Sequence, residues 1–372
     1  MPRRFEIPVP RDFLLRRDLC SYGYFLLWPN HWDVASHTYT TALVVPSGPV
    51  LLAATQGDGV RARRGQPLLV EASRSLSQAD CRDASEQIAR VLRLDEPPSA
   101  IRAFHAIDPR WRSSGRGRLM RSPSLFEDVI KTVTSCNVQW PSTVVMNRRL
   151  CEVLGPRAVR AGPVTHAFPS AAALARARPS TLRARCRCGY RDERIVELAR
   201  IFHRGVIDAS RLEDPATPDE IVHAHLLDLP GIGPYAAANI MQLLGRYARL
   251  PLDTESVRHG KTVLGMTGSD RSIMRRLHDH YAPMREHAFR SYWFELWQFY
   301  ESRRGPAWTW DRDTTGTTFT ASQLKPQAGV AAERARADVH ALGNRQRGPA
   351  RKASHDAQKP PRIRPLQPDR QG

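Results

Sequence analysis

Long apolar stretches are missing from this chain of 372 residues, and none of its uninterrupted apolar runs is long enough to cross a bilayer. The first residues, MPRRFEIPVPRDF, contain arginine but no apolar segment behind it, so they lack the pattern of a secretory signal. We therefore expect a cytoplasmic protein with no membrane partner. The length suggests two domains more readily than one, with room for a sizeable core.

Cysteine is scarce and scattered, which argues against a disulfide framework. Cys186 and Cys188 form a C-x-C pair, but no second pair lies at the spacing of zinc ligands. A cluster of four cysteines near the end of the helical region is also missing. We expect reduced thiols, no bound metal and no iron–sulfur cluster. The six cysteines are Cys20, Cys81, Cys136, Cys151, Cys186 and Cys188.

Acidic residues are outnumbered, with 37 Asp and Glu against 56 Lys and Arg, which gives a formal net charge of +19. Residues 305–372 hold 12 basic and 6 acidic residues, or +6, so the rest of the chain carries +13. A charge of this size is typical of a protein whose partner is a polyanion, most often nucleic acid. The alternative is a solvated surface in an arginine-rich proteome, which charge alone does not exclude.

Residues 1–115 are predicted to form a small mixed α+β domain. The runs TYTTALVV and PVLLAATQ are β-prone and flank Pro-Ser-Gly, which predicts a hairpin, and GQPLLVEAS predicts another strand. SLSQADCRDASEQIARVLRLD changes to a helical period that Ser77 can cap, and DEPPSA interrupts it. We place the domain boundary within the Arg-, Gly- and Ser-rich stretch 111–122.

Residues 116–304 are predicted to be almost entirely helical. Ser122 and Pro123, followed by an acidic turn, indicate one helix start, and Gly155 indicates the end of the next helix. Other helices are predicted in PSAAALARA, RDERIVELARIFHRG, TPDEIVHAHLLD, PYAAANIMQLLG, DTESVRHGKTVLG and REHAFRSYWFELWQFYESRR. Residues 305–372 are Pro-, Arg-, Gln- and Ala-rich, so we expect a disordered basic tail. The predicted fold class is α+β, with an all-α second domain.

A Pro-Gly-x-Gly turn separates two of these helices in HLLDLPGIGPYAAANIMQLLG. One apolar helix ends near Leu229, Gly231 and Gly233 permit a tight turn, and a helix of small residues begins at Pro234. Glycines let backbone N–H groups approach a phosphate, and the positive N-terminus of the next helix favours that anion. The pattern therefore predicts a helix-hairpin-helix that holds DNA by its backbone, with an ordinary αα-hairpin as the alternative.

A lone acid, Asp253, follows 18 positions after Tyr235, where RLPLDTESVRHG resumes as a helix. One role for this residue is the N-cap of that helix, which is a common use of aspartate. The other role is a carboxylate held at the helix start, facing DNA bound by the hairpin. The two roles are compatible.

These segments carry a family resemblance. LPGIGPYAAANI and LPLDTESVRH resemble the hairpin, the Gly/Pro-rich loop and the catalytic aspartate of the helix-hairpin-helix DNA glycosylase superfamily. SPSLFEDVIKTVTSCNVQW, LRARCRCGYRDERI and IARVLRLDE look like segments of eukaryotic 8-oxoguanine and bacterial 3-methyladenine glycosylases, so the resemblance covers about residues 12–304. It implies that the hairpin residues that bind DNA phosphate are Leu229, Gly231, Gly233 and Tyr235.

The resemblance assigns further roles residue by residue. Asp253 would be the catalytic acid that stabilises positive charge on the sugar and orients or deprotonates water. Asn137, Tyr190 and Arg191 match the residues that fill the gap left by a flipped base and contact the orphaned partner base. The alternatives are a turn or cap role for Asn137 and a loop aromatic packed on its neighbours for Tyr190.

One departure from the family separates two activities. Bifunctional members carry a lysine at the second position after the last glycine of the hairpin, where it forms a Schiff base with the sugar. Tyr235 occupies that position here, as an aromatic residue often does in the 3-methyladenine enzymes. We therefore expect a monofunctional DNA N-glycosylase of base excision repair. An 8-oxoguanine glycosylase is the second candidate, favoured by Asn137, Tyr190 and Arg191. A lesion-binding protein without activity is the third, and Asp253 argues against it.

Aromatic residues could line a base pocket, with Trp140, Tyr235, Trp293 and Trp297 as candidates. Electron-rich rings suit a cationic alkylated purine such as 3-methyladenine, although a terminal helix packing its aromatics into the core explains SYWFELWQFY equally well. The expected partner is double-stranded DNA with damaged bases, bound by a monomer that would be nucleoid-associated in a bacterium. A hairpin of this kind can hold a monovalent cation, and we expect no other cofactor.

Overall fold

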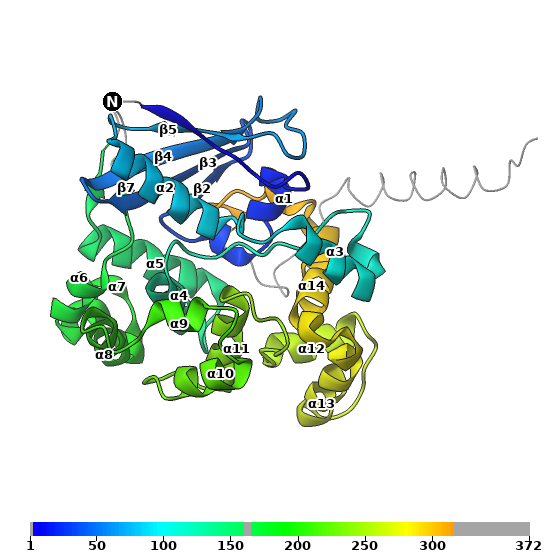
Figure 1. Cartoon of the computed structure of the whole chain (residues 1–372). Helices are drawn as coiled ribbons and strands as arrows, with labels where there is room; N and C mark the ends of the chain where they lie inside the picture. The colour runs from blue at the N-terminus through cyan, green and yellow to red at the C-terminus, as the bar shows by residue number, and fades with distance from the viewer. Residues whose placement is uncertain (1–2, 160–164, 316–372) are drawn as a thin grey trace, which may run out of the picture. The chain divides into compact units, whose positions relative to one another are not determined.

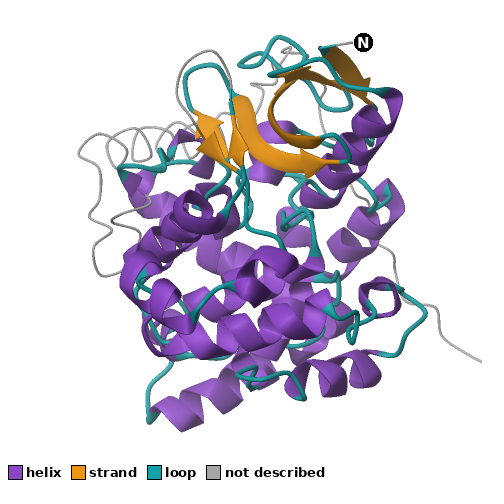
Figure 2. Ribbon diagram, turned by 90° about the vertical axis from the view of Figure 1, so that its left-hand side faces the viewer, coloured by secondary structure: helices purple, strands orange, loops and turns teal. Residues whose placement is uncertain are grey.

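The computed structural model describes residues 3–159 and 165–315, which lie within one compact unit. A five-stranded antiparallel sheet lies at one end of this unit and helices build the remainder (Figures 1 and 2). This arrangement confirms the α+β class. The sheet has the order β1-β5-β4-β3-β2. Its strands are β1 (Arg4–Ile7), β2 (His31–Asp33), β3 (Thr38–Val45), β4 (Gly48–Gln56) and β5 (Leu68–Ala72).

The predicted hairpin and helix cap of the first segment are confirmed. Val45 pairs with Gly48 across the tight turn between β3 and β4, and Gly48 has a φ of 110°, a value that favours glycine. Ser77 caps α2 (Gln78–Val91) in a reciprocal capping box with Asp80. α2 ends at Val91, where Arg93 follows with a φ of 55°, and DEPPSA instead leads into α3 (Pro98–Ile107), which was not predicted.

The predicted helices after residue 116 are also present, with small corrections. Ser124 caps α4, rather than Ser122. Gly155 follows α5 (Trp140–Leu154) with a φ of −78°, which any residue can adopt. Glycine is needed there because an added Cβ would collide with the Ala167 carbonyl oxygen. A two-stranded ribbon, β6 (Arg157–Ala158) with β7 (Thr165–His166), interrupts the helices, and α7, α9 and α13 were not predicted. The helices are α4 (Leu125–Ser135), α5 (Trp140–Leu154), α6 (Ala171–Arg176), α7 (Pro179–Cys186), α8 (Asp192–His203), α9 (Ala209–Glu213), α10 (Asp219–Leu227), α11 (Pro234–Leu243), α12 (Thr254–Thr262), α13 (Asp270–Tyr281) and α14 (Ala288–Arg304).

Two large apolar cores hold these elements. The first joins the inner face of the sheet, α1 (Leu15–Leu19) and the 3₁₀ turn η1 (Gly23–Leu26) to α12, α13 and α14. The second lies among α4 to α11. α14 packs against the N-terminal segment, and within that segment Tyr22 also lies beside α11, with its hydroxyl 3.4 Å from Asn239 Oδ1.

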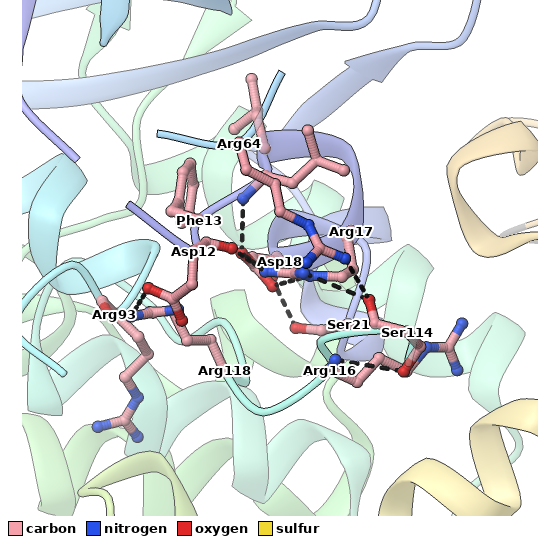
Figure 3. A network of polar contacts seen from close by, with 12 residues as sticks. Asp12, Phe13, Arg17, Asp18, Ser21, Arg64, Arg93, Ser114, Arg116 and Arg118 are labelled. Carbon is pink, nitrogen blue, oxygen red and sulfur yellow. Dashed lines mark hydrogen bonds and ion pairs between the residues drawn. The ribbon is translucent and has the colours of Figure 1, made fainter. Parts of the chain in front are cut away.

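The Arg-rich stretch that composition marks as a boundary is a packed connection. Arg118 is buried, pairs with Asp12 at 2.7 Å and donates to the carbonyl of Arg93 (Figure 3). Arg93 in turn donates to the carbonyls of Gln242 and Leu243 at the C-terminal end of α11, at 2.8 and 2.5 Å. A positive charge is favourable at that end of a helix dipole. These arginines therefore fix the helix that follows the hairpin.

Packed chain continues beyond residue 304, where the sequence analysis places the start of the tail. Trp310 is buried, with its ring 5.1 Å from that of Trp297, and Trp32 donates to the Trp308 carbonyl at 2.8 Å. The rest of the expected tail, residues 316–372, lies outside the described residues. Within residues 3–159 and 165–315, no helix combines the length and the apolar character that a membrane span requires.

Candidate active site

A cavity of about 430 Å³ opens where η1, α5, α11, α12 and α14 meet. A volume of this size falls within the range of small-ligand pockets. All four residues predicted for a base pocket line it, and so does the predicted catalytic acid. The lining residues are Tyr22, Gly23, Tyr24, Ser135, Val138, Gln139, Trp140, Thr143, Tyr235, Asn239, Pro251, Asp253, Thr254, Glu255, Arg258, Tyr292, Trp293, Leu296, Trp297 and Tyr300.

Asp253 reaches this cavity from the N-cap of α12. Its Oδ1 accepts from the Ser256 amide at 2.9 Å and from the Ser256 hydroxyl at 3.0 Å, and its own amide donates to Ser256 Oγ at 3.0 Å. This reciprocal capping box holds the carboxylate in one orientation. The structure therefore shows the helix-cap role, and it also places this carboxylate in the lining of the cavity.

Burial raises the pKa of Asp253 above its ordinary value, and the charge of Glu255 adds to this effect. The hydrogen bonds from Ser256 act in the opposite direction but do not cancel it. A carboxylate that is poorly solvated binds a positive charge or a proton more strongly than an exposed one. Asp253 therefore suits both the stabilisation of a developing cation and the acceptance of a proton from water.

Aromatic rings form one wall of the cavity, and their polar ends are anchored. Trp293 stacks on Trp297 with ring centroids 5.3 Å apart, and Tyr22 lies 4.6 Å from Trp293. The indole N–H of Trp293 donates to the Ser21 carbonyl at 2.8 Å, and that of Trp297 donates to the Cys20 carbonyl at 3.1 Å. Because both indoles are bonded to the N-terminal segment, the wall is preorganised.

Trp140 lies on the opposite element, at the start of α5. An added Cβ on Gly23 would lie 3.0 Å from its ring, so glycine at position 23 lets the indole pack against the backbone. This contribution of residues 22–24 was not predicted from the sequence. No motif marks them, because they enter the cavity only through the packing of η1 against α14.

A second carboxylate, Glu255, lines the cavity two residues after Asp253 and is held by two partners. Arg258 donates to it, through Nε at 2.9 Å, and the Tyr300 hydroxyl also donates to it. The Tyr292 hydroxyl donates to Ser256 Oγ at 3.1 Å. Glu255, Ser256 and Arg258 were not predicted by the hairpin or pocket motifs. Only their place on α12 next to Asp253 could have suggested them.

The hairpin turn lies between α10 and α11, as predicted. Gly231 has a φ of 77°, which a residue with a side chain rarely adopts, and the Ile232 amide closes the turn on the Leu229 carbonyl at 3.1 Å. Among the described residues, no acceptor is recorded for the amides of Gly231, Gly233 and Tyr235. The side chain of Leu229 is buried. Unpaired amides at a helix start form a site for an anion.

Tyr235 lies in the first turn of α11 and connects the hairpin to the cavity. Its carbonyl accepts from Asn239, and the Tyr22 hydroxyl donates to the side chain of Asn239 at 3.4 Å. Burial and the nearby charge of Asp253 raise the pKa of Tyr235 well above its ordinary value, so the phenol stays neutral. Its hydroxyl is therefore a neutral polar group beside the carboxylate.

The three residues predicted to fill the gap left by a flipped base lie together. Asn137 is exposed with a φ of 51°, and Tyr190 is 55% exposed. Arg191 was predicted to contact the orphaned base, but it is only 5% exposed in this structure. Its guanidinium donates to the Cys136 and Asn137 carbonyls and to the Tyr190 hydroxyl. Arg191 thus joins the loop between α4 and α5 to the turn at residues 189–191, while Asn137 and Tyr190 are exposed on these two segments.

No lysine lines the cavity within the described residues. Lys131 is buried and paired with Glu127 at 2.6 Å, and Lys261 pairs with Asp270 at 2.8 Å. No group of three or more His, Cys, Asp or Glu residues suited to a metal ion occurs within residues 3–159 and 165–315. The described lining of the cavity therefore offers carboxylates, hydroxyls, aromatic rings, two side-chain amides and the guanidinium of Arg258, but no amine.

The fold of the chain is similar to that of known proteins, although its sequence is not. No protein-family model and no curated protein sequence matches the chain. Solved structures do match it. A 3-methyladenine DNA glycosylase from Archaeoglobus fulgidus has a TM-score of 0.60 at 16% identity, covering 79% of this chain and 97% of that one. The apo 8-oxoguanine glycosylase/lyase of Clostridium acetobutylicum has a TM-score of 0.59 at 16% identity, with coverages of 80% and 97%. MBOgg1, solved with a low-affinity DNA ligand, has a TM-score of 0.59 at 17% identity, with coverages of 80% and 96%. These likenesses establish a shared fold.

Proposed function

Because the chain has the fold of helix-hairpin-helix DNA glycosylases, we propose that it is a monofunctional DNA N-glycosylase that removes alkylated purines of the 3-methyladenine type from duplex DNA. One observation carries this proposal. Asp253, a carboxylate of raised pKa, lines an aromatic cavity together with Tyr235, a residue in the first turn of the hairpin's second helix. A fold supports many activities, so the function is argued from this site.

The reaction follows from the placement of these groups. The unpaired amides of the hairpin hold the DNA backbone, and the damaged nucleotide leaves the stack to enter the cavity at a cost of a few kcal/mol. As the N-glycosidic bond breaks, its electron pair leaves with the base, and Asp253 stabilises the positive charge that develops on the sugar. Water then adds to the anomeric carbon and gives its proton to Asp253.

The chemistry of the cavity favours a base that is cationic. Aromatic rings attract a cation through their faces, and Trp140, Trp293 and Tyr22 present such rings to the cavity. Asp253 and Glu255 add two carboxylates, only one of which is paired with an arginine, Arg258. A purine alkylated at a ring nitrogen carries a formal positive charge, whereas 8-oxoguanine is neutral.

An 8-oxoguanine glycosylase remains the second candidate, because Asn137 and Tyr190 are both exposed on two segments that Arg191 joins. The absence of a lysine from the described lining of the cavity disfavours the lyase form of that activity.

Release of bases from duplexes that each carry one defined lesion tests the proposal. We expect 3-methyladenine or 7-methylguanine to be released under single-turnover conditions, at a rate at least tenfold above that for 8-oxoguanine, since a cation–π contact in a dry site contributes about 2 kcal/mol. Faster release of 8-oxoguanine would support the second candidate. Tight binding without release of any base would identify a lesion-binding protein and refute the enzymatic proposal.

Borohydride should trap no covalent complex between the enzyme and damaged DNA. A Schiff base needs an amine beside the sugar, and Tyr235 supplies a phenol at the position where bifunctional enzymes have lysine. The product should be an intact abasic strand that breaks only after alkali treatment. A glycosylase/lyase on its own substrate serves as the positive control in the same gel. Efficient trapping that is lost in a Lys131→Met or Lys261→Met variant would show a lyase and contradict the monofunctional assignment.

A further inference from the structure

Arg194, in the first turns of α8, lies directly across the hairpin turn. An ideal Cβ built on Gly231 would be 2.6 Å from Arg194 Cδ and 3.3 Å from its Nε. The aliphatic stem of the arginine therefore packs on the bare Cα of Gly231, where no other residue type would leave room. Glycine at this position serves two purposes, because its positive φ makes the turn and its missing side chain admits Arg194.

The charged end of Arg194 also contacts the loop that carries Tyr190. Its guanidinium carbon lies 5.8 Å from the centre of the Tyr190 ring. Arg194 thus touches the turn before α11 and the exposed aromatic of the neighbouring loop at the same time. Arg194 therefore links the hairpin turn to the segment that carries Tyr190.

The guanidinium of Arg194 is exposed and has no ion-pair partner in the described part of the chain. The neighbouring arginines are engaged: Arg183 pairs with Asp192 at 2.8 Å, and Arg191 donates to backbone carbonyls. An exposed guanidinium beside unpaired backbone amides favours the binding of an anion. Phosphate is the anion that matches the planar fork of a guanidinium.

We infer that Arg194 is a phosphate contact for the DNA strand held by the hairpin, and that it ties that grip to the placement of Tyr190 at the lesion. This inference rests on the proposed function, since it takes DNA as the ligand. In this arrangement the amides of the turn hold one phosphate, and the guanidinium of Arg194 neutralises a phosphate beside it. A purely structural role, in which Arg194 only packs the turn, is the competing explanation.

Binding of the full-length protein to a duplex with a stable abasic analogue, measured over a range of salt concentrations, distinguishes the two roles. Arg194→Met keeps an apolar stem on Gly231 but removes the charge, and Arg194→Lys keeps a charge without the fork. Arg204→Met is the matched control. Arg204 is an exposed arginine at the other end of α8, ten residues or about 15 Å away.

We expect Arg194→Met to weaken binding about tenfold or more at moderate salt, which is the effect of one lost charged hydrogen bond. The slope of log affinity against log salt should fall by about one, because one phosphate is no longer neutralised. Arg194→Lys should keep the slope and lose part of the affinity. Arg204→Met should change neither quantity, and all three variants should keep the melting temperature of the wild type.

An unchanged slope and affinity for Arg194→Met would overturn the inference, and so would a weaker affinity that comes with a large fall in melting temperature and an unchanged slope. The readout is binding rather than base release, so it is independent of catalysis. If the wild-type protein binds the duplex but releases no base, the proposed enzyme fails while this contact is still measured. If the wild type does not bind DNA at all, both proposals are refuted.

Discussion

Asp253→Asn is expected to lower the single-turnover rate of base release by about 10²–10⁴-fold, the usual contribution of a positioned general base. The asparagine removes the charge that would stabilise the cationic sugar and cannot take a proton from water. It keeps the cap of α12, because asparagine caps helices as well as aspartate does. Affinity for damaged DNA should be equal or higher, since a negative charge near the phosphates is lost.

Single-turnover base release and binding to a lesion duplex, measured together, check this expectation. Asp208→Asn is the matched control, because Asp208 caps α9 by accepting from the Arg211 amide and does not line the cavity. The control should keep the wild-type rate. If Asp253→Asn also released bases at the wild-type rate, Asp253 would be a helix cap alone.

The pH dependence of the reaction should show the raised pKa of Asp253. The ionised form is the active one, so the rate should fall as pH decreases, with a midpoint above the ordinary range of aspartate. The free energy of unfolding depends on pH in the opposite direction to the rate. A raised carboxyl pKa stabilises the fold at low pH, and this contribution is lost as pH rises through the raised value. Asp253→Asn should therefore be at least as stable as the wild type at neutral pH.

Trp310→Ala is expected to reduce the free energy of unfolding by about 3–5 kcal/mol, the range for truncating a large aromatic residue in a core. Trp310 is buried beside Trp297 and lies 6.5 Å from Phe25 by ring centroids, so its loss leaves a cavity behind the aromatic wall of the site. Base release should also slow, because Trp297 lines that wall.

Chemical denaturation of the full-length variant measures this loss directly. Trp310→Phe keeps most of the buried area and should lose a smaller part of the stability. Wild-type stability in Trp310→Ala would mean that the segment after Gly305 is not part of the core.

The hairpin and its acid could be found in the sequence because both depend on short-range chemistry. Gly231 and Gly233 mark a turn that other residues adopt only with strain, and Asp253 caps a helix through Ser256, three positions away. The strands β3 and β4 and helix α2 were predictable for the same reason, since a turn signal or a cap bounds each of them. Family resemblance added the expected roles of Asn137 and Tyr190.

The walls of the cavity were decided only by the tertiary structure. Tyr22 and Trp293 meet across more than two thirds of the chain, and no local period or motif records that contact. The burial of Arg191 and the packing of Trp310 were hidden similarly, because the family resemblance implies an arginine that contacts DNA and composition suggests a disordered tail. Local sequence determines turns, caps and helix faces through interactions within a few residues. Which faces of the helices and strands pack together depends on contacts throughout the chain. That packing places Asp253, which caps α12, in the lining of the cavity as well.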